Sequence, residues 1–270
     1  MLPWMDHGNA YGRLQSDTPG GVGGFSNTGN PNMDVLDGLY VEPYRCPSSA
    51  VPQWASVKEL LPCEDIKFLG ASYVGISGAA FRNGAVNPDS AYVFSGPVVL
   101  NGNPISVNDG TIHANNGILL QNQCIAIRDI KDGTTTTIMV AEQSTARFML
   151  STPAGADLVD APNLVLSSYP GSAWPSTGLK TTVKSGDTIL QPHMVSNVTT
   201  LRYPINMQHT ANLGGLGLGA GNKPIMSAHL GGAQVLFADG GVRMLNESID
   251  FNTLMSLTDR KDGNVISGAF

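Results

Sequence analysis

The chain has 270 residues, 41% of them hydrophobic, which is enough to bury one sizeable core, and no internal repeat dominates it. Only 13% of the residues are charged, whereas 32 glycines and 17 prolines favour turns and short strands, so helical bundles and coiled coils are excluded. The net charge of −6, with 15 lysines and arginines in no cluster, predicts no nucleic-acid partner. No run approaches the roughly 18 apolar residues of a membrane helix, so no membrane segment is expected.

Residues 1–45 are rich in glycine, asparagine and proline, which predicts an irregular, loop-rich surface segment. Cys46 and Cys63 follow in a proline-rich region, with 16 residues between them. A disulfide closing a loop of this size would contribute about 3 kcal/mol in the chain-entropy model, and an exported location favours it. Two unpaired, small hydrophobic residues remain an equally weighted alternative.

Short β-rich runs begin at residue 71. Strands are predicted at residues 71–76, 91–94 and 117–121. Residues 123–128 and 135–142 flank a glycine-containing turn and are predicted to pair as antiparallel strands. Cys124 lies in the first of these two runs, so a buried, unreactive thiol is expected there.

Residues 151–224 have the weakest pattern and are predicted to be a loop-rich insertion. The glycine-rich tract at residues 214–221 is interpreted as a mobile loop. A phosphate-binding loop does not fit, because the tract follows no strand and precedes Pro224 rather than a helix.

The clearest local pattern lies near the end of the chain. Two apolar runs, 233–238 and 242–245, flank an Asp-Gly-Gly turn and predict a β-hairpin. Capping side chains at residues 246–250 then precede an apolar stripe at helical spacing, which predicts a short helix against the sheet.

The same hairpin carries a family resemblance. His229 is followed by nine residues and then Asp239-Gly240, which resembles the H-X9-DG region of the DUF1559 proteins, a prepilin-type, pseudopilin-like family abundant in Planctomycetes. Four further segments are similar to family motifs: residues 1–11 ("LLPYLEQ"), 44–48 ("CPS"), 132–142 ("DGTSNT…E") and 262–267 ("GEVV").

The resemblance implies the fold, the location and the role. It implies a single α+β head domain over residues 1–270, mainly an antiparallel β-sheet, with long irregular loops and a short C-terminal helix. Family members usually begin with a long apolar helix that packs into a pilus-like fibre, and these residues are expected to begin downstream of it. An exported or cell-surface protein is therefore expected, with a structural role or a role in type II secretion and with other pseudopilin-like or secretion components as partners.

His229 and Asp239 are the candidate catalytic residues. His229 precedes the first hairpin strand and Asp239 lies in the turn at its far end, so a strand of roughly 20 Å separates them unless the chain doubles back at the glycines between. In the alternative, architectural interpretation, Asp239 makes the turn and His229 bonds to a neighbouring loop.

Two acidic turns are candidate calcium sites. Asp129 and Asp132 precede one glycine, and Asp259, Asp262 and Asn264 surround another. Calcium prefers six to eight oxygen ligands, and backbone carbonyls can add to such carboxylates. The resemblance adds support, because some pseudopilins carry calcium in the C-terminal region of the head. Solvated Asx turns are the commoner explanation of such sequences.

The short catalytic signatures of zinc hydrolases, redox enzymes and serine esterases do not occur in this sequence. The alternative function is therefore a hydrolase of small esters or lactones that depends on a divalent metal such as calcium, with a histidine as base or ligand. His113, His193, His209 and His229 are the candidates for that histidine.

Overall fold

The protein is described from a computed structural model. It describes residues 2–15, 31–49, 53–56, 67–82, 84–87, 90–94, 98–100, 103–105, 111–120, 124–144, 198–207 and 221–266.

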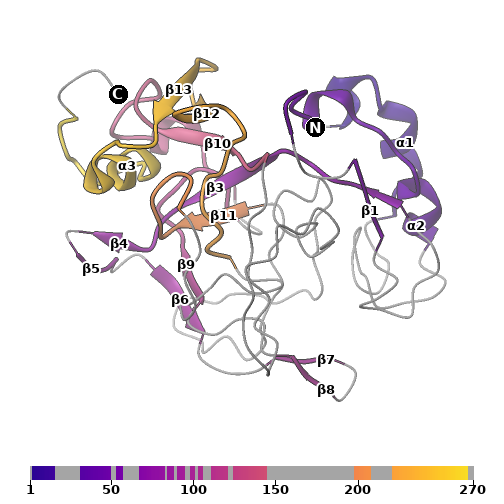
Figure 1. Cartoon of the computed structure of the whole chain (residues 1–270), viewed down its shortest axis with the longest axis horizontal. Helices are drawn as coiled ribbons and strands as arrows, with labels where there is room; N and C mark the ends of the chain where they lie inside the picture. The colour runs from indigo at the N-terminus through magenta and orange to yellow at the C-terminus, as the bar shows by residue number, and fades with distance from the viewer. Residues whose placement is uncertain are drawn as a thin grey trace.

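A five-stranded sheet forms the centre of the molecule (Figure 1). Its strands, in spatial order, are β11 (Val198–Leu201), β3 (Tyr73–Ala79), β10 (Ile138–Glu142), β12 (Gly232–Phe237) and β13 (Val242–Asn246). β11 runs parallel to β3, and the other neighbours are antiparallel. The fold is therefore α+β with a mixed, mostly antiparallel sheet, as the sequence predicts.

Short strand pairs and helices surround this sheet. The pairs are β1 (Trp54–Ser56) with β2 (Lys67–Leu69), β4 (Phe81–Arg82) with β5 (Ala85–Val86), β6 (Ser90–Phe94) with β9 (Thr111–Ala114), and β7 (Val98–Leu100) with β8 (Asn103–Ile105). The α-helices are α1 (Gly8–Arg13), α2 (Pro31–Leu36) and α3 (Phe251–Thr258), and 3-10 helices occupy Leu2–Met5, Glu42–Tyr44 and Ile127–Asp129. No helix in the described part of the chain is both long and apolar enough to cross a membrane.

The C-terminal hairpin and helix confirm the prediction. β12 and β13 pair in register around a turn in which Gly240 has a φ of +88°, a conformation that glycine adopts without strain. The Asp250 side chain accepts a hydrogen bond from the Thr253 N–H at 2.9 Å and so begins α3. Helix α3 then packs against β3 and β10.

One face of the sheet forms the core with α3. The core residues include Val74, Ile76, Ile138, Val235, Phe237, Leu245, Leu254 and Leu257. Burial of aliphatic and aromatic side chains of this kind contributes about 1.5 to 3 kcal/mol each, so the C-terminal segment is part of the folding unit.

Two buried asparagines stabilise the less regular side of the sheet. Asn222 accepts from the Ile112 N–H at 2.7 Å and donates to the Ile112 carbonyl at 2.7 Å and the Thr200 carbonyl at 3.1 Å, so it bridges β9 and β11. Asn116 accepts from the Ala79 N–H at 3.1 Å and donates to the buried Asp259 carboxylate. These side chains satisfy backbone groups that no strand partner reaches.

The strand predictions at residues 71–76 and 91–94 are confirmed by β3 and β6, but two others are wrong. Residues 124–126 are irregular and lead into an exposed 3-10 turn in which Ile127 is 75% exposed. β10 pairs instead with β3 and β12, which are distant in the sequence and occupy both of its edges, so no edge is left for residues 123–128. Residues 117–119 form bends and not a strand, although the Gly117 N–H and the Leu119 N–H still donate to carbonyls of β3.

The loop predictions need two corrections. Residues 1–45 contain the short helices given above, because local hydrogen bonds close turns between the glycine-rich stretches; residues 16–30 lie outside the described part. Within 151–224 the β-branched run at 198–201 forms β11. Residues 151–197 and 208–220, which include most of the glycine tract, lie outside the described part of the chain. Cys124 is exposed and not buried, since the predicted strand around it does not form.

Candidate functional site

Glu142 is a fully buried carboxylate at the end of β10. Its Oε2 atom accepts hydrogen bonds from the Ser227 hydroxyl at 2.8 Å and from the Gln234 N–H at 3.1 Å. Its other oxygen, Oε1, is buried and has no hydrogen-bond partner among the described residues. Because an unpartnered buried acceptor is costly, one side of this carboxylate is available for a further ligand.

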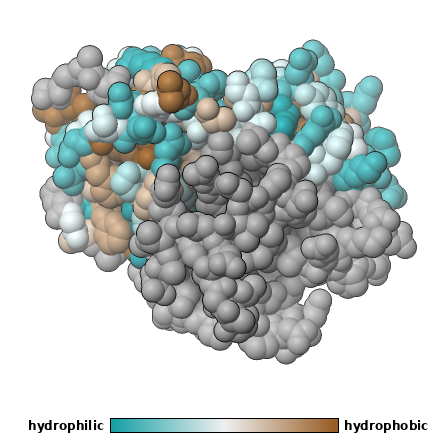
Figure 2. Space-filling view, in the orientation of Figure 1, coloured by the Kyte–Doolittle hydropathy of each residue, from teal (hydrophilic) through white to brown (hydrophobic). Residues whose placement is uncertain are grey.

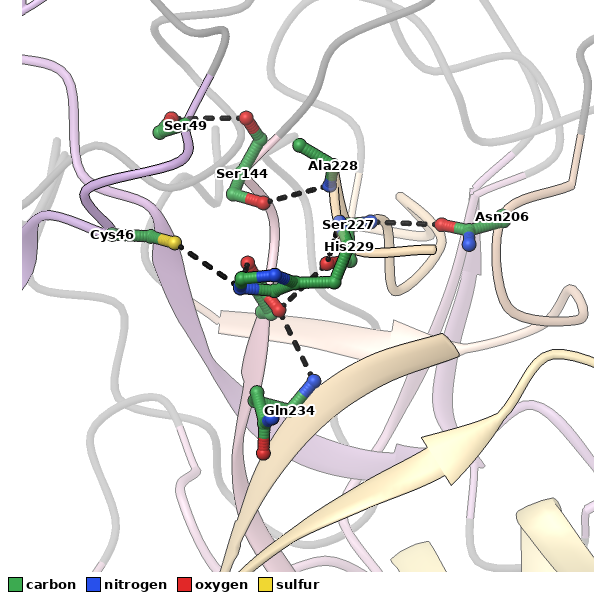
Figure 3. A network of polar contacts seen from close by, with 9 residues as sticks. Cys46, Ser49, Ser144, Asn206, Ser227, Ala228, His229 and Gln234 are labelled. Atoms are coloured by element: carbon green, nitrogen blue, oxygen red, sulfur yellow. Dashed lines mark hydrogen bonds and ion pairs between the residues drawn. The ribbon is translucent and has the colours of Figure 1, made fainter. Parts of the chain in front are cut away.

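His229 faces that free oxygen. Its Nε2 atom lies 3.6 Å from Glu142 Oε1, and its side chain is 35% exposed. The segment before the histidine is held by several bonds: the His229 N–H donates to Ser227 Oγ at 2.9 Å, and the Ala228 N–H donates to Ser144 Oγ at 3.1 Å. Figure 3 shows the imidazole ring of His229 with one nitrogen turned toward the sulfur of Cys46.

Cys46 completes the cluster from the N-terminal part of the chain. It is 5% exposed, and its Sγ lies 3.5 Å from His229 Nε2. The Ser49 hydroxyl, in the following turn, donates to the Ser144 carbonyl at 2.9 Å and so fixes this loop beside β10. Burial raises the pKa of the Cys46 thiol, and the neighbouring Glu142 adds to the effect.

The arrangement differs from a hydrolytic triad. In a triad the nucleophile and the carboxylate occupy opposite nitrogens of the imidazole: the imidazole takes the proton of the nucleophile, and the carboxylate orients the ring and stabilises its charged form. Here Cys46 Sγ and Glu142 Oε1 both approach Nε2. The three ligand atoms lie within 4.8 Å of one another, and theirs is the single such group of three or more His, Cys, Asp or Glu side chains in the described part of the chain. A sulfur, a nitrogen and an oxygen this close together could hold one metal ion between them.

The two predicted catalytic residues are not brought together. Asp239 stays in the hairpin turn, where its Oδ1 accepts from the Gly241 N–H at 2.8 Å and its own N–H donates to the Thr134 carbonyl at 3.1 Å. The carboxylate beside His229 is that of Glu142. The catalytic roles of His229 and Asp239 stay predictions, but the turn-forming role of Asp239 in the architectural alternative agrees with the structure.

The acidic turns meet at the C-terminal end of the sheet. The Asp132 carboxylate accepts from the Asp262 N–H at 2.6 Å and the Gly263 N–H at 3.0 Å. Asp259 is nearly buried, and burial, with added repulsion from Asp262 and Asp132, raises its pKa.

The remaining candidate ligands are held locally. Asp262 accepts from both the backbone and the side-chain amide of Asn264, each at 2.7 Å. Asp129 accepts from the Ala126 N–H at 3.3 Å within its own 3-10 turn. These oxygens already have partners within the protein, and calcium binding at either turn stays a prediction.

Cys46 and Glu142 are the residues that the sequence analysis did not assign to a site. Both lie in segments that carry the family resemblance, and a carboxylate that ends an apolar β run is a usable signal of a buried charge. Cys46 is a free thiol in the structure, in agreement with the unpaired alternative and not with the bridge; Cys63 lies outside the described residues. Of the other candidate histidines, His113 lies on β9, and His193 and His209 are outside the described part.

Comparison with known proteins identifies a family. The model of a family described as "Protein of unknown function (DUF1559)" matches residues 1–252. No curated protein and no solved structure matches the chain. The match includes all three members of the Cys46, Glu142 and His229 cluster.

Proposed function

Because the chain belongs to the DUF1559 family, we propose that it is the head domain of an exported, pseudopilin-like protein with a structural or secretion-associated role. Its partners in this proposal are other pseudopilin-like subunits, which contact it through the open face of the sheet. The observation that carries the proposal is an incompletely covered apolar strip on that face, opposite the face that packs against α3.

The strand register defines this strip. Val140 pairs with Leu236, and Leu236 pairs with Val242, so these side chains lie on one face of neighbouring strands; Met244 lies two residues further along β13. Val242 is 64% exposed and Met244 is 42% exposed. An apolar strip across three strands is the kind of surface that an amphipathic or apolar helix of a partner subunit covers.

Other apolar residues are also exposed on the C-terminal segment. In Figure 2 hydrophobic atoms gather over the half of the molecule that holds the C-terminal hairpin and helix, whereas the half with the N-terminal helices is mainly hydrophilic. Val265, 92% exposed, and Leu230, 97% exposed, add to the apolar surface of the C-terminal segment.

The location is tested by expressing the tagged gene in its bacterial host and separating the cell fractions. We expect the protein in the envelope or outside the cell, where protease added to intact cells digests it. A protein confined to the cytoplasm and protected from protease would overturn the proposal.

The contact surface is tested by cross-linking in the same cells. A Val242→Glu, Met244→Glu double variant should lose the cross-linked complexes, because two charges cannot be buried against an apolar partner. Tyr11→Glu is the control, since Tyr11 is 57% exposed on α1. Complexes that survive the double variant but not the control would place the contact elsewhere.

A further inference from the structure

The cluster of Cys46, Glu142 and His229 has the donor set and spacing of a transition-metal site. We propose that these three side chains bind one divalent ion of the zinc class, as a site separate from the acidic turns and independent of the proposed structural role. The proposal depends on the convergence of three ligand atoms, on the unpartnered oxygen of Glu142, and on the bonds that orient the ligands.

Two of the three distances between the ligand atoms fit a shared ion, and the third, from Cys46 Sγ to Glu142 Oε1, is at most 4.8 Å. With zinc bonds of about 2.3 Å to sulfur and about 2.0 to 2.2 Å to nitrogen and oxygen, tetrahedral angles place neighbouring ligand atoms about 3.4 to 3.6 Å apart. Sγ to Nε2 is 3.5 Å and Nε2 to Oε1 is 3.6 Å in the structure. The second distance is too long for a hydrogen bond and corresponds to an ion pair when His229 is protonated; with a neutral His229, a shared cation accounts for the position of Glu142 Oε1.

The unpartnered oxygen of Glu142 indicates that the cluster lacks a positively charged or hydrogen-bonding partner. Glu142 Oε2 is satisfied by Ser227 and Gln234, whereas Oε1 is buried with no hydrogen-bond partner among the described residues. A cation at the centre of the cluster would satisfy it. With Cys46 as the thiolate, the two anionic ligands also balance the charge of a divalent ion, which removes the cost of a net charge in a buried site.

The donor types select the metal. Calcium and magnesium prefer oxygen ligands, whereas a thiolate and an imidazole suit zinc and related late transition metals. Ser227 provides the supporting contacts: its hydroxyl donates to the Glu142 carboxylate and accepts from the His229 N–H. Such supporting bonds typically change metal affinity by about 10- to 100-fold.

The site joins three distant parts of the chain. Cys46 precedes the sheet, Glu142 ends β10, and His229 precedes the C-terminal hairpin. An ion bound only by the folded state therefore stabilises the contact between the N-terminal segment and the sheet. Because His229 is 35% exposed, water can reach the site and occupy a further coordination position.

The test uses the purified chain, kept reduced and stripped with a chelator. Zinc is titrated by calorimetry, and cobalt(II) is added separately as a spectroscopic probe. We expect one ion per chain and a thiolate-to-cobalt charge-transfer band. The band should disappear in Cys46→Ser, and zinc affinity should fall at least about tenfold in Glu142→Gln and His229→Gln, with a smaller loss in Ser227→Ala.

Two controls separate this site from other ligands. Cys124→Ser removes the exposed cysteine, and His7→Gln removes a histidine outside the cluster; both should bind zinc like the parent. Circular dichroism checks that each variant is folded, and His229→Gln tests the site without changing a buried residue. No zinc binding by the folded parent, a charge-transfer band that persists in Cys46→Ser, or affinities unchanged in all three ligand variants would overturn the proposal.

Discussion

Replacing Lys223 by methionine should stabilise the protein, and by an amount that depends on pH. Lys223 is 4% exposed, and its Nζ has no hydrogen-bond partner among the described residues. Its backbone is fixed, because its carbonyl accepts from Thr199 Oγ1 at 2.8 Å and from Gln143 Nε2 at 3.3 Å. The ammonium group therefore cannot reach water without breaking buried contacts.

Burial lowers the pKa of Lys223 from 10.5 to about 7. The unfolded chain therefore binds a proton that the folded chain does not bind between about pH 7 and pH 10.5, so stability rises with pH across this window. At 1.36 kcal/mol per pH unit, the full cost below pH 7 is about 4 to 5 kcal/mol. Methionine has a similar length, no charge and a flexible chain, so it should fill the same space without this cost.

Urea unfolding of parent and Lys223→Met at about pH 6 and about pH 9.5 measures the effect. The variant should be more stable by about 4 kcal/mol at the lower pH and by about 1 to 2 kcal/mol at the higher one. Lys67→Met, at an exposed lysine of β2, is the control and should not reproduce the gain in stability at the lower pH, because its side chain is not buried. Equal stability of parent and Lys223→Met at both pH values would refute the reasoning.

Comparing each variant with the parent at the same pH cancels the effect of other titrating groups on stability. Burial raises the pKa values of Tyr44, Tyr73 and Tyr203, so their ionisation destabilises the folded state as the pH rises above about 10. Because the parent and the lysine variants share these tyrosines, only the difference between proteins reports on Lys223.

Three further predictions concern the C-terminal segment. Gly240→Val should lower the free energy of unfolding by about 1 kcal/mol or more, since residue 240 has a φ of +88°; a variant as stable as the parent in urea would contradict the turn assignment. Asp250→Ala should destabilise the start of α3 by removing the cap bond from Thr253, and loss of helical dichroism before global unfolding would show that α3 frays first. Asp262→Ala should leave melting without calcium nearly unchanged, because its bonds to Asn264 are exposed, and should abolish any rise that calcium gives the parent. A calcium-induced rise that persists in Asp262→Ala would remove this residue from the predicted site.

The C-terminal hairpin and helix were readable from the sequence because their causes are local. A glycine at the turn, apolar runs on either side and the Asp250 cap act within a few residues, so the pattern predicts their position closely. The fold class followed from a different source: the glycine- and proline-rich, weakly charged composition favoured short strands, and the family resemblance implied an α+β head domain.

The strand partners of β10 required the tertiary structure. The adjacent run around Cys124 has strand-forming residues, but β3 and β12 occupy both edges of β10 and bury the core residues Val74 and Val235. Local propensity cannot show which of several apolar runs makes this contact.

The sequence and the tertiary structure each contributed part of the candidate site. The sequence places His229, Cys46 and Glu142 in three separate segments that carry the family resemblance, but it assigned only His229 to a candidate site. Their convergence depends on the Ser227 and Ser144 bonds that hold segments far apart in the chain against β10. Because ligand atoms must meet within a few ångströms while sequence spacing constrains only neighbours along the chain, only the tertiary structure could replace Asp239 with Glu142 as the carboxylate beside His229.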